Sequence, residues 1–507
     1  MAARSRSLTH QTLAGLLWTF YGKGAYALLQ IAILAILARL VSPEHFGVVS
    51  AALIVIALST IVSQVGVGPA LVQRSALEQR HIDTAFLASL LLGLGLGAAI
   101  WLGAPLAAGF FRIDGVTPVL RALAWLFPLQ GLATVAESLV KRDLRFRWLA
   151  HVDVISYSAG YGLVGIPAAL LGWGVWALVA GQLAHNAFKT ALLLYGHPPR
   201  LRGRLETAAL RDLMYFGGGF TIAKIANQVA QQGDYLVVGR YLGAAQLGYY
   251  GRAYNLMSAP ASGIGTVLDA VLFPVMARVQ HEAQRLTAAY RRGMALITLV
   301  VLPPSVVLVL LAPEVVHVVL GPRWTPMIVP FQILAAGMML RTGSKLGDSL
   351  TRATGAVYRR AWRQIVYAIL VVGGAIVGQR WGIVGVAWFV LGALAVNYLL
   401  MAQLSLSEAA MTWSGFWRAH LPAARLAVLC GPLVWGLATL LRHAGVPSLV
   451  TLAAAATLML GCSLLLAYAF PRVFLGDEGL WMMDTMRGFA GKLRGGKAAV
   501  VNAERTA

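Results

Sequence analysis

"WTFYGKGAYALLQIAILAILARL", residues 18–40, decides the fold class of this chain. The stretch is apolar over a length that crosses a hydrocarbon layer about 30 Å thick as a helix, although Lys23 lies within it. Similar apolar runs recur from Leu13 to Phe470. Only 12% of the 507 residues are charged and 59% are hydrophobic, whereas an ordinary soluble domain carries about 25% charged residues. The composition therefore indicates a polytopic helical membrane protein.

The apolar runs predict an all-α polytopic membrane protein with about 14 transmembrane helices. Two runs are short or interrupted by glycine, so the expected count lies between about 12 and 14. The first run is too long for the hydrophobic region of a signal peptide, and we expect it to remain as a helix. The expected spans are residues 13–38, 46–72, 84–111, 117–139, 151–171, 174–195, 211–239, 246–275, 293–320, 326–351, 364–380, 384–405, 421–441 and 447–470.

Basic residues are distributed unevenly over the expected loops. Loops expected on the inside contain the basic runs 141–147, 200–204 and 358–363, whereas the outer loops contain isolated arginines such as Arg39 and Arg240. An excess of Lys and Arg marks cytoplasmic loops, so we expect both termini in the cytoplasm of a bacterial plasma (inner) membrane. The net charge of +22 is dispersed over these loops, which favours anionic lipid over nucleic acid as its partner.

The chain resembles itself at an offset of 201 residues. "ARLVSPEHFGVVSAA" (38–52) then aligns with "GRYLGAAQLGYYGRA" (239–253), and Lys23 aligns with Lys224. The aligned helices are separated by an even number of spans, so the two halves have the same orientation. This predicts a parallel repeat of two six-helix halves, with a substrate site between them, and an additional C-terminal helix pair. We interpret Arg39 and Arg240, at outer helix ends, as headgroup anchors.

The repeat and the loop charges predict a six-part organisation. The expected parts are a cytoplasmic N-terminus (1–12), an N-terminal six-helix lobe (13–195), a basic cytoplasmic linker (196–210), a C-terminal six-helix lobe (211–405), an additional helix pair (421–470) and a basic, partly disordered cytoplasmic tail (471–507).

Polar residues follow one face of several expected helices. Lys224, Asn227, Gln228 and Gln231 have the spacing i, i+3, i+4, i+7, which places them on one helix face. Polar side chains are energetically costly on a helix face that contacts lipid, so we expect this face to contact protein or water. A second interpretation is that the lysines snorkel or form structural ion pairs. The candidate residues of a substrate cavity are Lys23, Tyr26, Gln30, Lys224, Asn227, Gln228, Gln231, Arg252, Arg341 and Lys345.

Three aspartates within expected spans are candidates for coupling transport to protons or sodium. They are Asp234, Asp269 and Asp348, and a static ion pair is the alternative role for each. Cys430 and Cys462 both lie in apolar runs and lack the spacing of metal ligands or of a disulfide framework. We therefore expect no metal site and no bound cofactor.

The segment "GDYLVVGRYLGAAQLGYYGRAYNLMSAPASGIGTVLDAVLFPVMARVQ" (233–280) resembles bacterial polysaccharide exporters of the Wzx/colanic-acid type. These belong to the multidrug/oligosaccharidyl-lipid/polysaccharide exporter superfamily. "ARLVSPEHFGVVS" (38–50) and "ESLVKRDLRFRWLA" (137–150) support the resemblance, which extends over residues 10–405. It implies a flippase that moves an undecaprenyl-diphosphate-linked oligosaccharide from the cytoplasmic to the periplasmic leaflet by alternating access, for exopolysaccharide, lipopolysaccharide or O-antigen biosynthesis. It also implies membrane lipids and a polysaccharide polymerase or co-polymerase as partners.

Two other transporters and one class of enzyme compete with this interpretation. A multidrug exporter of the same superfamily would favour an acidic cavity, whereas Lys and Arg outnumber Asp and Glu within the expected spans. A peptidoglycan-precursor exporter would share both architecture and cavity chemistry. A membrane glycosyltransferase or polymerase needs a catalytic acid or base, but the loops contain no Asp-x-Asp pair and no Gly-rich phosphate loop. We therefore expect a transporter and not an enzyme.

Overall fold

The computed structural model describes residues 24, 26–63, 67–73, 77–198, 206 and 221–484, and these are almost entirely helical, with no strand among them. Within the helices, the description omits the side chains of residues 61–63, 67, 69, 73, 221–227, 266–271 and 357. The chain forms two compact units. Unit 1 contains residues 1–259, 316–334 and 364–393, and unit 2 contains residues 260–315, 335–363 and 394–507. The expected lobes and additional helix pair stay predictions, and the linker lies largely outside the described residues.

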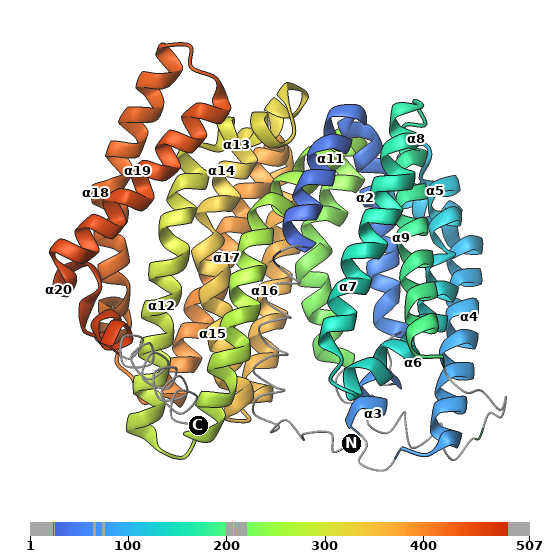
Figure 1. Ribbon diagram of the computed structural model, residues 1–507, viewed down its shortest axis with the longest axis horizontal. Coiled ribbons are helices and arrows are strands. Elements are labelled where there is room, and N and C mark those ends of the chain that lie inside the picture. The colour runs from blue at the N-terminus through green and yellow to red at the C-terminus, as the bar shows by residue number, and fades with distance from the viewer. Residues whose placement is uncertain are drawn as a thin grey trace, which may run out of the picture. The chain divides into compact units, whose positions relative to one another are not determined.

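Unit 1 is built around a bundle in which α4 packs on α6 and α6 packs on α9 (Figure 1). A first apolar helix, Tyr26–Leu40, precedes it. The other elements of unit 1 are α2 (Pro43–Ser63), α3 (Val67–Gln73), α4 (Gln79–Phe111), α5 (Val116–Leu123), α6 (Leu126–Arg142), α7 (Phe146–Tyr157), the π-helix η1 (Ser158–Gly165), α8 (Ile166–Leu170), α9 (Val175–Gly196), and the 3₁₀-helices η3 (Pro322–Met327) and η4 (Gln379–Trp381).

Unit 2 is organised around α12, which packs on α15 and α18, while α18 packs on α19. Its apolar core includes Leu311, Cys430 and Met459. Its own elements are α12 (Ala283–Leu310), α15 (Met338–Ala353), α18 (Trp413–His443), α19 (Ser448–Ala469) and α20 (Pro471–Phe474). Five helices contribute residues to both units: α11 (Thr221–Arg278), α13 (Ala312–Val319), α14 (Ile328–Ala336), α16 (Val357–Gly378) and α17 (Gly382–Glu408).

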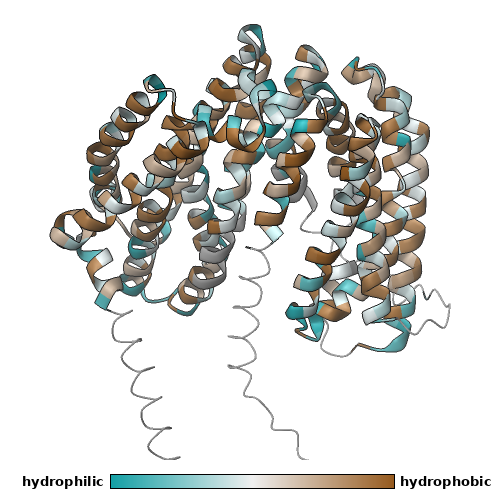
Figure 2. Cartoon of the chain, turned by 45° about the horizontal axis from the view of Figure 1, so that its top comes forward, coloured by the Kyte–Doolittle hydropathy of each residue, from teal (hydrophilic) through white to brown (hydrophobic). Residues whose placement is uncertain are grey.

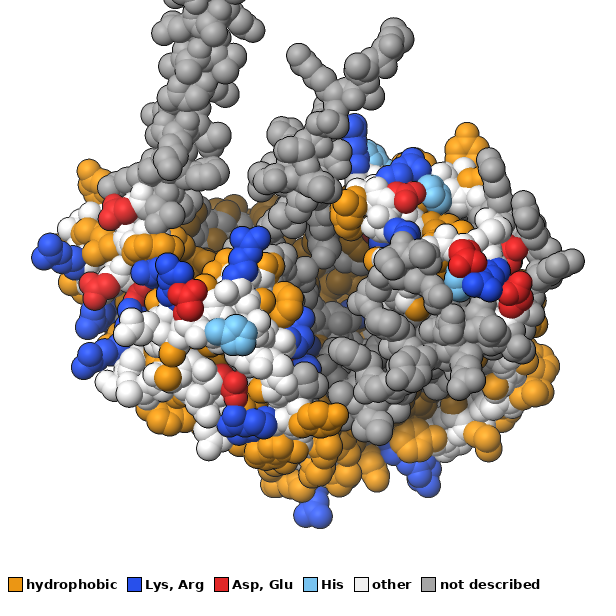
Figure 3. All heavy atoms as spheres, turned by 90° about the horizontal axis from the view of Figure 1, so that it is seen from below, with side chains coloured by type: hydrophobic (Ala, Val, Ile, Leu, Met, Phe, Trp, Pro, Cys, Tyr) orange, Lys and Arg blue, Asp and Glu red, His pale blue; other side chains and the backbone are white. Residues whose placement is uncertain are grey.

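Seven helices of the described chain are long and apolar enough to cross a membrane, by length and composition. They are Pro43–Thr60, Gln79–Phe111, Val116–Arg142, Ala283–Leu310, Tyr358–Glu408, Trp413–His443 and Ser448–Ala469. Tyr358–Glu408 covers two expected spans, because η4 joins α16 to α17. Hydrophobic residues extend along the helices in Figure 2. Lys and Arg side chains lie beside Asp and Glu side chains on the face shown in Figure 3. The expected count of about 14 and the repeat over whole halves stay predictions.

The π-helix η1 follows α7 and lies against α9. A Cβ atom at Gly160 would lie 2.3 Å from the backbone nitrogen of His185 in α9. Only glycine permits this approach of the two backbones. π-Turns of this kind occur frequently at functional sites, and here η1 carries Tyr161 while α7 ends at Tyr157.

α2 and α11 approach each other through two glycines that the repeat aligns. A Cβ at Gly47 would lie 1.8 Å from the carbonyl oxygen of Ala244, and a Cβ at Gly248 would lie 2.0 Å from that of Pro43. Pro43 and Ala244 are also related by the offset of 201 residues, so the contact is reciprocal. α11 bends just before this contact, at Gly243, where φ is +83°. The short aligned segments therefore pack on each other with local two-fold symmetry.

Arg39 and Arg240, which the repeat also aligns, bind the ends of other helices within unit 1. Arg39 donates a hydrogen bond from Nη2 to the carbonyl oxygen of Val318, at 2.7 Å. Arg240 donates from Nη1 to the carbonyl oxygen of Phe110, at 2.5 Å. Val318 and Phe110 lie in the last turns of α13 and α4, where carbonyls lack helical partners and carry the negative end of the dipole. Their interpretation as headgroup anchors missed these contacts, which we call the arginine clamps.

Candidate functional site

Arg252 lies at the centre of a polar and aromatic cluster in unit 1. It follows the kink at Gly243 by nine residues, or about 13 Å along the helix. Its guanidinium carbon lies 4.8 Å from the centre of the Phe46 ring in α2. Its Nε is buried without a hydrogen-bond partner, and Arg252 forms no ion pair with any residue that the structure describes. The helix packing therefore half-buries a cation that no carboxylate among the described residues neutralises.

Tyrosines from three helical segments surround this arginine. Tyr157 and Tyr161 lie with ring centres 4.8 Å apart, and both of them, like Tyr235, lie near the Arg252 guanidinium. We call Arg252, Phe46, Tyr157, Tyr161 and Tyr235 the Arg252 cluster. Aromatic faces attract a guanidinium by about 0.5–2 kcal/mol, whereas the cost of removing an ion from water is several kcal/mol. The Phe46 ring therefore compensates only part of the cost, and an anion would supply the rest.

Neighbouring polar groups extend the Arg252 cluster. The Tyr161 hydroxyl donates a 2.5 Å hydrogen bond to Oε1 of Gln182 in α9. The His185 ring lies 5.4 Å from Tyr157, and its Nδ1 is buried without a hydrogen-bond partner among the residues described. Tyr26 packs edge-on against Tyr157 at 5.2 Å and hydrogen-bonds Gln30. Tyr26 and Gln30 on one expected helix and Arg252 on another are thus linked through Tyr157.

Five other candidate cavity residues lie on the first expected helix (Lys23) and on α11 (Lys224, Asn227, Gln228 and Gln231). Gln228 is half-buried and Gln231 is exposed. Lys23 lies outside the described residues, and so do the side chains of Lys224 and Asn227, although both belong to α11. The expected placement of Lys23 and Lys224 in one substrate cavity therefore stays a prediction.

Arg341 and Lys345 belong to unit 2 and lie one turn apart on α15. Both are half-buried. A Cβ at Gly265 would lie 2.8 Å from Cδ of Lys345, so the lysine stem runs along a glycine of α11. The structure thus keeps these two cations on one face of α15 within unit 2.

The candidate coupling aspartates have distinct environments. Asp234 is 1% exposed, and its Oδ2 accepts a 2.7 Å hydrogen bond from the Tyr250 hydroxyl. Asp348 forms an ion pair with Arg360, whose Nη2 lies 2.8 Å from Oδ2. The side chain of Asp269 lies outside the described residues. Asp348 matches the static alternative, and Asp234 is buried with its Oδ2 bound by the Tyr250 hydroxyl.

An ionic network joins three helices of unit 1, and we did not predict it as a unit. Lys189 of α9 has its Nζ 3.1 Å from Oδ1 of Asp153 in α7 and 3.6 Å from Oε2 of Glu137 in α6. Lys141 binds the other oxygen of Glu137 at 2.6 Å. Lys189 and Asp153 each resemble an isolated charge in an apolar run. Among the described residues, no three His, Cys, Asp or Glu side chains gather to hold a metal ion.

The rings around Arg252 were also missed, although one signal marks them. Tyr157 and Tyr161 are four residues apart and therefore share a helix face. Phe46 and Tyr235 carry no such signal, because tertiary packing alone brings α2 and both parts of α11 together.

Comparisons with known proteins agree with the resemblance. A family described as polysaccharide biosynthesis proteins matches residues 36–329. The succinoglycan biosynthesis transport protein ExoT of Rhizobium meliloti is 30% identical over 289 residues, covering 56% of this chain and 58% of ExoT. The teichuronic acid biosynthesis protein TuaB of Bacillus subtilis is 22% identical, covering 92% of this chain and 97% of TuaB. The fold is that of the lipid II flippase MurJ in an inward closed conformation, with a TM-score of 0.71, 11% identity, and coverage of 91% and 100%.

Proposed function

This chain belongs to the polysaccharide biosynthesis protein family, and we propose that it is a flippase of lipid-linked oligosaccharides. Its relatives include a protein named as a succinoglycan transporter, and its fold is shared with a lipid II flippase. A multi-pass membrane transporter of polysaccharide biosynthesis is therefore the general function. We infer further that the substrate is an undecaprenyl-diphosphate-linked oligosaccharide and that it moves from the cytoplasmic to the periplasmic leaflet of the inner membrane.

The unneutralised Arg252 cation carries this proposal. A diphosphate is the anionic part of the inferred substrate, and a guanidinium binds phosphate oxygens with two parallel hydrogen bonds. The free Nε of Arg252 is one such donor, and the Tyr157 hydroxyl is a further donor. Lys23, Lys224, Arg341 and Lys345 would add positive charge, and Asn227, Gln228, Gln231 and Gln30 would bind sugar hydroxyls.

The proposed cycle is alternating access. The two sequence halves rock about a site near the bilayer midplane, as in transporters built from parallel repeats. The long prenyl tail stays in lipid while the diphosphate and sugars pass through the cavity. Coupling to protons or sodium through Asp234, Asp269 or Asp348 stays a prediction, and so do an added polymerase partner and the cytoplasmic placement of both termini.

Two exporters of the same superfamily remain the competing functions. A multidrug exporter of cationic compounds would require an acidic binding surface. The cluster around Arg252 contains no carboxylate, and Asp348 is already paired with Arg360. This charge favours an anionic substrate. A peptidoglycan-precursor exporter would also use a cationic site, and the relatives in succinoglycan and teichuronic acid biosynthesis favour a polysaccharide precursor over it.

Substitution of Arg252 tests the proposal. In a host that lacks this gene, Arg252→Met is expected to lower surface polysaccharide roughly 10- to 100-fold, because charge-assisted hydrogen bonds contribute about 1.5–3 kcal/mol. Arg252→Lys keeps the charge without the planar fork and is expected to be intermediate. Arg121→Lys is the matched control, since Arg121 also stacks on a ring, that of Trp101, at 4.5 Å.

The lipid-linked intermediate is measured in the same strains, with protein amount checked by immunoblot. Accumulated intermediate in the Arg252→Met strain, at normal protein amount, would place the defect after synthesis and before polymerisation. Normal surface polysaccharide in that strain would refute the role of Arg252 in substrate binding.

A further inference from the structure

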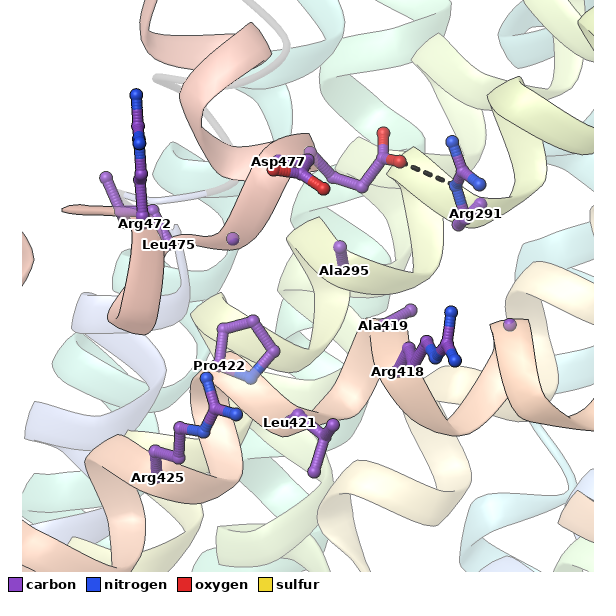
Figure 4. Close-up of a pocket in the computed structure, with 13 residues that line it drawn as sticks. Arg291, Ala295, Arg418, Ala419, Leu421, Pro422, Arg425, Arg472, Leu475 and Asp477 are labelled. Atoms are coloured by element: carbon purple, nitrogen blue, oxygen red, sulfur yellow. Dashed lines mark ion pairs between the residues drawn. The ribbon is translucent and has the colours of Figure 1, made fainter.

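A basic cleft of about 280 Å³ opens in unit 2 between α12, α18 and the segment that includes and follows α20 (Figure 4). Its charged lining residues are Arg291, Arg418, Arg425, Arg472, Asp477 and Glu478. Small-molecule sites occupy about 300–1,000 Å³, so this cleft suits a group of modest size. Four arginines against two carboxylates make an anion the matching ligand.

One wall of the cleft is held in place by ion pairs. Glu478 lies 2.5 Å from Nε of Arg291, the contact dashed in Figure 4, and 3.2 Å from Nε of Arg292. The guanidinium of Arg292 also stacks 3.7 Å above the Trp481 ring. Glu478 is therefore neutralised by two cations of α12. The segment after α20 is fastened to α12 by this contact, so the cleft exists before any ligand binds.

The other arginines retain unused donors. Neither Arg418 nor Arg472 makes a hydrogen bond or an ion pair with the part of the chain that the structure describes. Arg425 uses one of its donors, Nη1, on the carbonyl oxygen of Val473 at 3.1 Å. Asp477, the second carboxylate, is exposed at the rim. The cleft thus presents a surplus of guanidinium groups.

Apolar surface continues from the cleft along α18. Arg418 and Arg425 are seven residues apart and share a helix face. Leu421 and Val428 follow each of them by three residues and are 45% and 71% exposed. Trp417, one turn before Leu421, is 49% exposed, and exposed tryptophans mark the interface between lipid and water. A free anion would use the arginines alone, whereas a lipid would use the arginines and the apolar track.

We propose that this cleft binds the phosphate headgroup of an anionic phospholipid, with its acyl chains along Leu421 and Val428. Basic pockets between helix ends on the cytoplasmic side are suited to such headgroups. Arg418 and Arg472 hold the phosphate, and Arg425 contacts it from deeper in α18. The Glu478 contacts set the shape of the cleft without touching the lipid. The cleft shares no residue with the Arg252 cluster, and the proposal does not rest on the proposed transport.

Binding is measured on the purified full-length protein by thermal unfolding during titration with dioctanoyl phosphatidylglycerol. Arg418→Gln/Arg472→Gln is the cleft variant, and its folding is favoured because neither side chain has a partner to lose. Arg278→Gln/Arg285→Gln is the matched control, since both arginines are exposed in unit 2 outside the cleft. We expect the apparent affinity to fall about 10- to 30-fold in the cleft variant and to stay unchanged in the control.

Three comparisons separate this lipid from other sources of the same phosphate chemistry. Dioctanoyl phosphatidylcholine and inorganic phosphate are each expected to bind with an apparent affinity at least 10-fold lower than that of phosphatidylglycerol. Equal stabilisation by free phosphate would overturn the lipid assignment. Tighter binding of a prenyl diphosphate, lost in the same cleft variant, would instead identify the cleft as a substrate site. An equal loss of affinity in the control variant would overturn the proposal, because net charge alone would then explain binding.

Discussion

The arginine clamps at Arg39 and Arg240 predict a measurable change in the opening of the protein. Each clamp donates a charge-assisted hydrogen bond to a carbonyl at a helix end. Such bonds contribute about 1.5–3 kcal/mol, and exposure places these near the lower limit. Losing both would therefore cost about 3 kcal/mol. If the clamps stabilise only the closed conformation, their loss raises the population of molecules that are open at the helix ends near Arg39 and Arg240 about 100-fold.

The labelling rate of a buried cysteine reports that population. Ser50 is 7% exposed and lies two turns into α2 from Pro43. In a background without Cys430 and Cys462, Ser50→Cys reacts with an impermeant maleimide only when this end opens. The double variant Arg39→Gln/Arg240→Gln is expected to react about 100-fold faster.

The matched control removes the same charge from exposed arginines expected on the same side. Arg323→Gln/Arg380→Gln serves, because neither side chain makes a hydrogen bond with the described residues. Each single clamp variant should give roughly a 10-fold increase. An unchanged rate in the double clamp variant would refute the reasoning, and so would an equal increase in the control.

Two further predictions concern packing and the ionic network. Gly47→Ala places a Cβ 1.8 Å from a carbonyl oxygen of α11. It should lower the free energy of unfolding by about 1–3 kcal/mol or more, measured by thermal unfolding. Gly95→Ala is its control and should leave the stability unchanged, because nothing lies within 4 Å of a Cβ at that position. Lys189→Met leaves Glu137 and Asp153 without their shared cation and should cost about 1–2 kcal/mol, since the partly exposed pairs are screened. Adding Glu137→Gln and Asp153→Asn should restore most of that stability, and no recovery would contradict the electrostatic account.

Several features of the site could be predicted from sequence because they depend on short spacings. The apolar runs follow from hydropathy along the chain. The alignment of Arg39 with Arg240 follows instead from self-comparison at an offset of 201 residues. The polar face of α11 stays a prediction, because the side chains of Lys224 and Asn227 lie outside the described residues. Arg252 was named among the cavity residues as a cation within an expected span. The family resemblance at residues 233–280 also agrees with the match over residues 36–329.

The partners of these residues were decided by tertiary packing. Phe46 lies beside Arg252, and Lys189 lies between Asp153 and Glu137, only because particular helix faces meet. Arg39 was read as a headgroup anchor, and the structure directs it to a carbonyl at the end of α13. Hydropathy adds up residue by residue along the chain, so the sequence by itself determined the membrane class. Contacts between helices depend on rotation and depth, which periodicity leaves open, so only the tertiary structure decided what each buried charge touches.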